Sequence, residues 1–172
     1  MPQVIEVPVP HDCSLLDRFQ SVYFCDAYQT SLSKPNLSVQ DAYEAVFAHP
    51  PGWAKGLMKV RGLLASVLGL KHVEDALLAQ DQGMKYQVGQ RAGLFSIQSI
   101  EPNELVVGDD DKHLNFKISI YKSSANGVQV LTLSTAVEVH NGVGKLYMLV
   151  VTPFHRLIAR SMLQKAADSG RL

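Results

Sequence analysis

An excess of charge of either sign is missing from this sequence. The chain has 16 basic and 16 acidic residues and a formal net charge of zero. Proteins that bind nucleic acid concentrate basic residues to meet the phosphate backbone. The charge balance therefore predicts no nucleic-acid partner.

Cysteine is also scarce, with Cys13 and Cys25 the only two. They lie outside any close CxxC pair, so we expect neither a disulfide framework nor a thiol metal site. The segment MPQVIEVPVPHDCS has no basic stretch leading into an apolar run, which argues against a secretory signal. Both features predict a reduced compartment, and we expect a cytoplasmic protein.

Long apolar runs and catalytic motifs are absent as well. The strongest apolar run, Leu146 to Val151, is far shorter than the roughly 20 residues of a spanning helix. We therefore expect no integral membrane segment. The sequence contains no GxSxG, HExxH, P-loop or glycine-rich dinucleotide motif. These absences disfavour nucleophilic catalysis, and we expect no metal and no cofactor.

What remains has the size and composition of one globular domain. The 172 residues are 47% hydrophobic and 19% charged, so residues 1–172 can form a single domain with a substantial core. A β-rich segment at residues 22–31 predicts a first strand. Ser38 precedes an acid-containing turn and predicts a helix to about Ala48, and the apolar spacing of Trp53 to Leu68 predicts a second helix.

After a linking region that runs through Gly83, the hydrophobic period changes to the alternation of strands. Asn126-Gly127 predicts a two-residue hairpin between two long strands. In the second of these strands one face is mainly apolar and the other mainly polar. The first face carries Leu131, Leu133, Thr135, Val137 and Val139, and the second carries Thr132, Ser134, Ala136, Glu138 and His140.

The pattern becomes helical again from Gly144 to about Ser169. An apolar stripe is predicted at Phe154, Leu157, Ile158, Ser161 and Met162. Pro153 is expected to bend this helix or to begin its second half. The whole order predicts an α+β fold, in which a curved antiparallel sheet wraps around a long C-terminal helix and two short helices follow the first strand.

Three segments add a resemblance to this pattern: PPGWAKGLMKVRGLL, GDDDKHLNFKISIY and VEVHNGVGKLYMLVVTPFHRLIARSML. Their DDxHLxF, HN and PFHR elements resemble those of an uncharacterised bacterial family of the START-like, polyketide-cyclase-like (SRPBCC) superfamily. The resemblance covers about residues 22–165 and implies the helix-grip fold. By analogy with that fold, we expect a small apolar or amphipathic molecule to bind between the sheet and the last helix.

Glu138 and His140 are candidate acid–base residues because they emerge on the same face of a strand. They would serve a site if that face is the inner one, and they would be solvated if it is the outer one. Asp26 lies between aromatic residues, and it either pairs with an arginine or lines a pocket. We consider these three residues the catalytic candidates of a metal-independent cyclase or lyase.

The acids at positions 109–111, followed by His113, suit a turn between strands better than a metal or acid–base site. Arg156 and Arg160 are one helical turn apart, and they could pair with these acids or hold an anionic head group. Candidate ligand-binding residues are Trp53, Arg61, Arg91, His113, Tyr147 and Arg156. A third functional hypothesis assigns the helix from Lys145 to Lys165 to a membrane surface or to a protein interface. The sequence does not predict an oligomeric state.

Overall fold

The computed structural model describes residues 2–17, 19–54, 56, 62 and 86–172. Within these residues, seven antiparallel strands form one sheet in the order β1-β2-β7-β6-β5-β4-β3. The elements, in chain order, are β1 (Ile5–Glu6), the 3-10 helix η1 (Ser14–Leu16), β2 (Phe24–Ser31), α1 (Val39–Phe47), β3 (Arg91–Ala92), β4 (Phe95–Ile100), β5 (Glu104–Asp110), β6 (Leu114–Ala125), β7 (Val128–Val139) and α3 (Gly142–Asp168).

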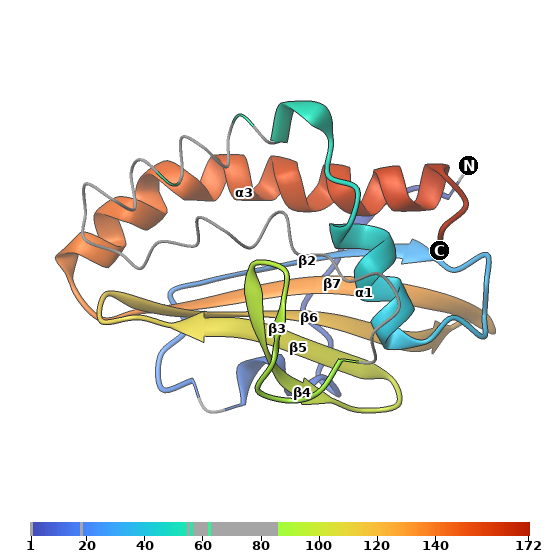
Figure 1. Cartoon of the computed structure of the whole chain (residues 1–172), viewed down its shortest axis with the longest axis horizontal. Coiled ribbons are helices and arrows are strands. Elements are labelled where there is room, and N and C mark those ends of the chain that lie inside the picture. The colour runs from blue at the N-terminus through green and yellow to red at the C-terminus, as the bar shows by residue number, and fades with distance from the viewer. Residues whose placement is uncertain (1, 18, 55, 57–61, 63–85) are drawn as a thin grey trace.

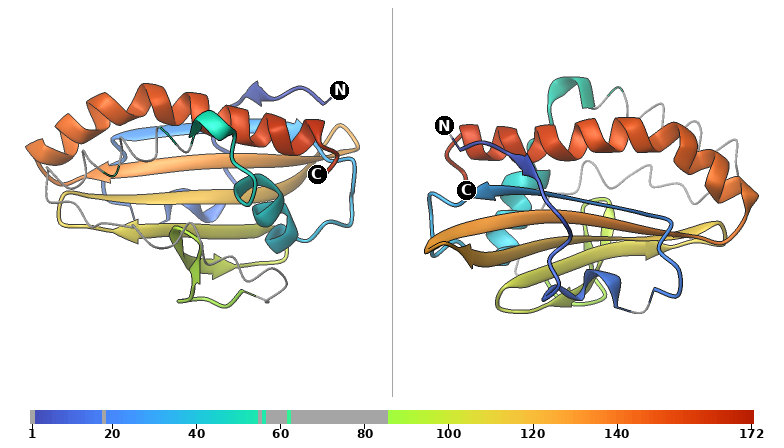
Figure 2. Two further views of the ribbon diagram at one scale, coloured as in Figure 1. Left: turned by 45° about the horizontal axis from the view of Figure 1, so that its top comes forward. Right: turned by 180° about the vertical axis from the view of Figure 1, so that it is seen from behind.

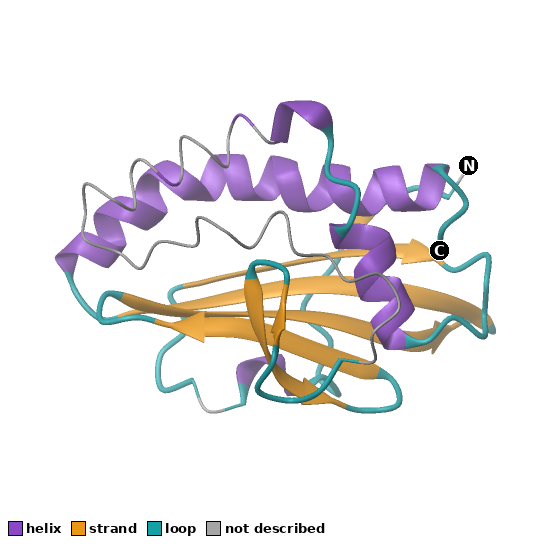
Figure 3. Cartoon of the chain, viewed as in Figure 1, coloured by secondary structure: helices purple, strands orange, loops and turns teal. Residues whose placement is uncertain are grey.

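The long helix α3 lies along one face of the curved sheet, and α1 packs on the same side (Figure 1). We call this the inner face of the sheet. Figure 3 shows the α+β arrangement, with helix above and strands below. The predicted fold class is confirmed: a curved antiparallel sheet carries a long C-terminal helix in a helix-grip-like arrangement.

Local sequence explains where α1 begins. The Ser38 hydroxyl accepts a hydrogen bond from the backbone N–H of Asp41 at 3.1 Å, which caps the first turn as predicted. The helix ends at Phe47, before the Pro50-Pro51 pair. The second predicted helix, Trp53 to Leu68, falls mostly outside the described residues.

The predicted hairpin joins the two longest strands. Ala125 pairs with Val128, which leaves Asn126 and Gly127 as the loop. Their φ angles of 51° and 77° are the positive values that this tight turn requires. The turn sets the register of β6 against β7, and so determines which side chains share each face.

Helix α3 is continuous through Pro153. Since proline has no N–H, the carbonyl of Leu149 lacks its usual helical donor, and this side of the helix is exposed to solvent. The hydroxyl of Thr152 donates to the Met148 carbonyl at 2.6 Å in the same turn. The helix arches over the sheet in Figure 1.

Two apolar clusters lie between the inner face and the helices. The larger contains Leu131 and Leu133 of β7 beneath α1 and the C-terminal half of α3. The smaller joins Leu114 and Val137 to Tyr147 and Met148 in the N-terminal half of α3. The apolar face of β7 is thus the helix-covered face, as its composition suggested.

The opposite, outer face is covered by the N-terminal segment, which crosses in front of the strands in the right-hand view of Figure 2. Cys13 and Leu15 pack against Ala136 there. The buried Glu104 carboxylate accepts hydrogen bonds from the Ser14 N–H at 2.9 Å, the Ser14 hydroxyl at 2.8 Å and the Ser119 hydroxyl at 2.5 Å. The sequence pattern did not predict this second layer.

Within the described residues, no helix combines the length and the apolar character needed to cross a bilayer.

Candidate functional site

A polar pair lies between the sheet and α3. Nε2 of His155, in the middle of α3, is 3.3 Å from Oδ1 of Asp26 on β2. The Asp26 side chain is 1% exposed and the His155 side chain is 23% exposed. The carboxylate is therefore buried, while the imidazole connects it to the solvent.

Periodicity explains why these two side chains meet. Along β2, Phe24, Asp26 and Tyr28 alternate with residues of the outer face, so all three point toward α3. Along α3, His155 lies seven residues from both Met148 and Met162, which are buried in the smaller and larger apolar clusters respectively. Residues seven apart share a helix face. The polar pair therefore lies between the two apolar clusters.

The second carboxylate oxygen of Asp26 is the unusual atom of this site. Oδ2 is buried and has no hydrogen-bond partner among the described residues. Thr135, also buried, lies opposite Asp26 in the register of β2 with β7. An unsatisfied buried acceptor costs about 1–3 kcal/mol, and more when it is charged. Among the described residues the Tyr28 phenol interacts with this carboxylate, and a donor on a bound molecule could complete the hydrogen bonding of Oδ2.

Phe24 borders the pair on its solvent side. The His155 ring meets it edge to face, with centroids 5.7 Å apart and an interplanar angle of 89°. The guanidinium of Arg156 lies over the same ring, 5.6 Å from its centroid. Phe24 therefore orients the imidazole and holds an exposed cation beside the buried carboxylate.

Tyr28 adds a neutral phenol to the site. Burial, followed by the negative charges of Asp26 and Glu6, raises the pKa of Tyr28 to about 12, although Arg156 acts in the opposite direction. The phenol consequently stays protonated at neutral pH, and a hydrogen bond to the Asp26 side chain also contributes to its raised pKa. The site combines a carboxylate, an imidazole, a phenol and a guanidinium among apolar side chains.

This combination is suited to two kinds of chemistry. A buried carboxylate can orient an imidazole and stabilise its protonated form, as acid–base catalysis requires. The same acceptor and apolar surroundings can instead hold the polar end of an amphipathic molecule. As for metal ions, the described part of the chain contains no group of three or more His, Cys, Asp or Glu side chains placed to hold one.

The structure separates Glu138 from this site. Glu138 lies on the outer face, where its carboxylate accepts hydrogen bonds from the N–H groups of Gln20 at 3.2 Å and Ser21 at 2.9 Å. His140 follows the end of β7 and is exposed. Of the three catalytic candidates, only Asp26 faces α3.

His113 lies at the corner where β7 leads into α3. Its Nδ1 is 3.1 Å from Oδ1 of Asn141, and the Asn141 side-chain amide donates to the Lys112 carbonyl at 3.1 Å. Asn141 Oδ1 also accepts from the N–H of Gly144 at 3.2 Å and so caps α3. These contacts join the loop after β5 to the start of α3.

Asp109, in the acidic segment 109–111, has a different partner from the predicted one. Asp109 forms an ion pair with Arg91 of β3 at 3.3 Å and accepts from the Ser96 hydroxyl at 2.6 Å. The predicted clamp to the α3 arginines is therefore wrong for Asp109, and its partner comes from the neighbouring hairpin. Asp109 and Asp110 belong to β5, and the turn itself begins after them.

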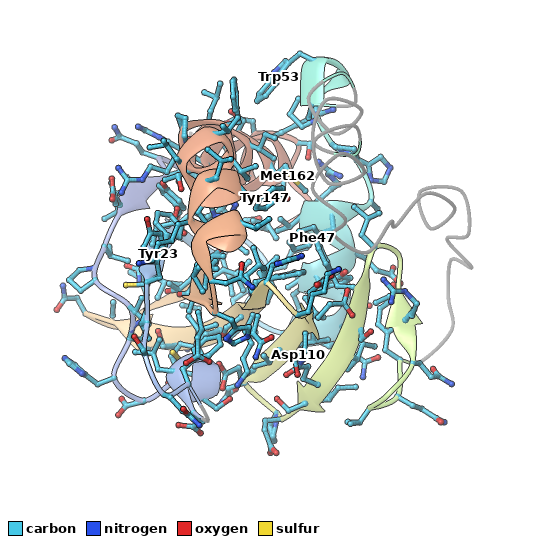
Figure 4. All side chains as sticks on the ribbon, turned by 90° about the vertical axis from the view of Figure 1, so that its left-hand side faces the viewer. Tyr23, Phe47, Trp53, Asp110, Tyr147 and Met162 are labelled. Atoms are coloured by element: carbon cyan, nitrogen blue, oxygen red, sulfur yellow. The ribbon has the colours of Figure 1, made fainter. Side chains whose placement is uncertain are left out.

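The remaining ligand-binding candidates are dispersed. Trp53 is 45% exposed and lies above α3, on the side away from the sheet (Figure 4). Tyr147 is buried in the smaller cluster, and Arg156 lies on Phe24 as described above. Arg61 falls outside the described residues.

Sequence reasoning missed His155, Phe24 and Tyr28 as members of one site with Asp26. The available signal was the seven-residue spacing of Met148, His155 and Met162, which places the histidine on the sheet-facing side of the helix. The partner strand could not be read from that spacing, because Asp26 is 129 positions away.

A search of curated proteins returns no match to the chain. A family model described as "Protein of unknown function (DUF2867)" matches residues 18–162. This range includes both halves of the polar pair and the inner-face strands. Because the match covers most of the sequence, the chain belongs to the DUF2867 family.

Proposed function

We propose that this protein binds a small amphipathic molecule between the inner face of the sheet and α3, with the polar end of the ligand at Asp26. We further propose that the DUF2867 chain is a divergent member of the START-like superfamily. The helix-grip-like arrangement supports that relationship. Fold analogy supports only the class of ligand, so the proposal depends on the site itself.

The observation that carries the proposal is the buried Oδ2 of Asp26, for which the described residues supply no hydrogen-bond partner. A hydroxyl or ammonium donor on a ligand would satisfy this oxygen and remove an energetic cost from the folded state. The two apolar clusters on either side of the pair supply the surroundings for an apolar body. Arg156, at the exposed edge, would tolerate an acidic substituent on the same ligand.

A second function is favoured by the contact between His155 and Asp26. The imidazole binds the carboxylate through Nε2, which leaves Nδ1 to exchange a proton with a bound molecule. In this alternative the protein is a metal-independent acid–base catalyst of the cyclase or lyase type. His155 would be the proton-transfer group and Asp26 would orient it.

Native mass spectrometry of the full chain purified from cells tests the binding proposal. We expect a small molecule to remain bound to the wild type and to the control Glu138→Gln, and to be lost from Asp26→Asn. Both substitutions exchange a carboxylate for an amide, but only one acts on the inner face. Equal retention by all three proteins, or no bound molecule in the wild type, would contradict the proposal.

A thermal-shift series then defines the chemistry of the ligand. Dodecylamine and dodecanol present a hydrogen-bond donor on the same apolar chain, whereas dodecanoate presents a carboxylate. We expect the two donors to raise the melting temperature of the wild type, and to do so much less for Asp26→Asn. Stabilisation of both proteins to the same extent would place the ligand elsewhere.

His155→Gln separates binding from catalysis. If the protein only binds, the molecule released from this variant has the same mass as that from the wild type. If His155 transfers protons, the variant accumulates the substrate, which differs from the wild-type molecule in mass after a lyase step and in chromatographic retention after a cyclisation that loses no atoms. Mass and retention together therefore distinguish the two functions even while the substrate is unidentified.

A further inference from the structure

The side of α3 that faces away from the sheet is apolar along the N-terminal half of the helix. We call these residues the outer stripe. Leu146 and Leu157 are each 54% exposed, Leu149 is 74% exposed, Phe154 43% and Val150 36%. They recur at spacings of three and four residues, so they share one broad face over about 17 Å of helix. A contiguous exposed apolar surface of this kind marks an interaction site.

The charged residues that α3 itself places around the outer stripe are basic. Lys145, Arg156, Arg160 and Lys165 belong to α3, and its one acidic residue is Asp168 at the C-terminal end. Helical geometry places Lys145, Arg156 and Arg160 along the same flank of the stripe. The stripe therefore combines an apolar surface with a row of cations.

Trp53 extends this surface beyond α3. Its side chain is 45% exposed and lies above the helix on the side away from the sheet (Figure 4). The Lys165 ammonium donates to the Pro50 carbonyl at 3.2 Å, which ties the Trp53 segment to α3. Tryptophan favours the boundary between hydrocarbon and water, where its ring is apolar and its N–H is solvated.

We propose that the outer stripe of α3, together with Trp53, docks the protein on an anionic lipid surface. The helix would lie parallel to the membrane, with its leucines at the acyl boundary and its cations among the head groups. Charge complementarity selects this occupant over a second copy of the chain. Two copies meeting through the stripe would bring their rows of lysine and arginine together.

Apart from Arg156, which lies over Phe24, the inference uses residues on the side of α3 opposite the ligand site. It also requires no membrane-spanning segment. The apolar residues would insert only to the depth of their side chains, and each lysine or arginine would add electrostatic attraction to the surface.

Vesicle flotation of the full-length chain tests the proposal. We expect the protein to float with vesicles of equal parts phosphatidylcholine and phosphatidylserine, and to stay unbound with phosphatidylcholine alone. Raised salt should release it, because screening weakens the attraction between surface charges. Equal binding to both kinds of vesicle, or no binding to either, would overturn the proposal.

Three variants localise the contact. Leu149→Asp should lower partitioning to the anionic vesicles at least about tenfold, since it removes a leucine side chain from the boundary. Arg160→Glu should lower partitioning about tenfold through the lost and reversed charge. Val88→Asp is the control, because Val88 is 62% exposed but lies outside α3, and it should bind like the wild type.

Folding and oligomeric state are measured alongside binding. Circular dichroism establishes that each variant is folded, and these exposed positions make loss of folding unexpected. A loss of binding in Val88→Asp equal to that in Leu149→Asp would overturn the localisation to α3. A concentration-dependent dimer in size-exclusion chromatography that Leu149→Asp abolishes would identify a second copy as the occupant and overturn the lipid proposal.

Discussion

Nε2 of His155 lies 3.3 Å from Oδ1 of Asp26, across 129 positions of the sequence. This contact joins the middle of α3 to β2 at a point where the surrounding packing is apolar. A buried ion pair, which this contact forms when His155 is protonated, rarely stabilises a fold more than apolar side chains would. The pair is therefore better explained by a role in binding or catalysis than by a contribution to stability. Its contribution to the free energy of unfolding can be measured.

Removing the histidine alone should destabilise the protein. His155→Ala leaves the Asp26 carboxylate buried without its partner, so we expect the free energy of unfolding to fall by about 1–3 kcal/mol in urea denaturation. Arg160→Ala, an exposed change on the same helix, should alter it by less than about 0.5 kcal/mol.

Replacing both Asp26 and His155 by apolar residues should not destabilise the protein. We expect Asp26→Leu combined with His155→Leu to leave the free energy of unfolding unchanged or to raise it by up to about 2 kcal/mol. A double variant less stable than His155→Ala would show that the pair is primarily structural.

The pKa of Tyr28 should report the charge of Asp26. Since that carboxylate is the second cause of the raised pKa, after burial, Asp26→Asn should lower the Tyr28 pKa from about 12 toward the usual value of 10. Carbon-13 NMR of the tyrosine Cζ atoms measures this titration, and Tyr28→Phe assigns the signal. Tyr86, whose pKa of about 12 arises from burial and Glu44, is the internal control and should not change.

The raised pKa of Tyr28 also makes the stability of the fold depend on pH. The folded protein holds the Tyr28 proton more tightly than the unfolded chain, so between pH 10 and about pH 12 the unfolded state loses protons first. The contribution of Tyr28 is complete below pH 10 and is lost as the pH rises through this window. Asp26→Asn should narrow the window, and an unchanged window would contradict the assignment.

The N-terminal segment should depend on Glu104. Glu104→Ala removes the acceptor of three hydrogen bonds from Ser14 and Ser119, and the free energy of unfolding should fall by about 2–4 kcal/mol. Hydrogen exchange should then accelerate in residues 13–16. Glu138→Ala is the matched control: it removes an acceptor of two backbone N–H groups in a partly exposed position, and should cost less than about 1 kcal/mol. Equal decreases in the free energy of unfolding of the two variants would show that the burial of Glu104 has no role.

The start of α3 should not tolerate a side chain at Gly144. A Cβ there would collide with the His113 backbone carbonyl, whereas a Cβ on Gly142 meets nothing within 4 Å. We expect Gly144→Ala to lower the thermal unfolding midpoint, at a cost of about 1–3 kcal/mol. Gly142→Ala should have little effect or stabilise the helix slightly. A lower thermal unfolding midpoint for Gly142→Ala than for Gly144→Ala would contradict the close approach of the His113 loop to the helix.

Local physical chemistry was sufficient for most of the secondary structure. The serine cap before α1 and the Asn126-Gly127 turn act through neighbouring residues, so the sequence predicted them directly. The apolar face of β7 identified the helix-covered side of the sheet. The short strand β1 and the helix η1 were missed, because a two-residue strand and a single 3-10 turn carry no period of their own.

Only the tertiary structure decided which polar residues meet. Alternation along β7 showed that Glu138 and His140 share a side, but their placement depended on the N-terminal segment that covers the outer face. The HN and PFHR elements likewise have separate roles that depend on the tertiary structure. Asn141 caps α3 and contacts the His113 loop, whereas His155 contacts the buried Asp26 carboxylate. Periodicity fixes the face on which a side chain emerges, because it is a property of neighbouring residues. The partner across the core depends on how distant elements pack, and for Asp26 that was settled by the path of α3 over β2.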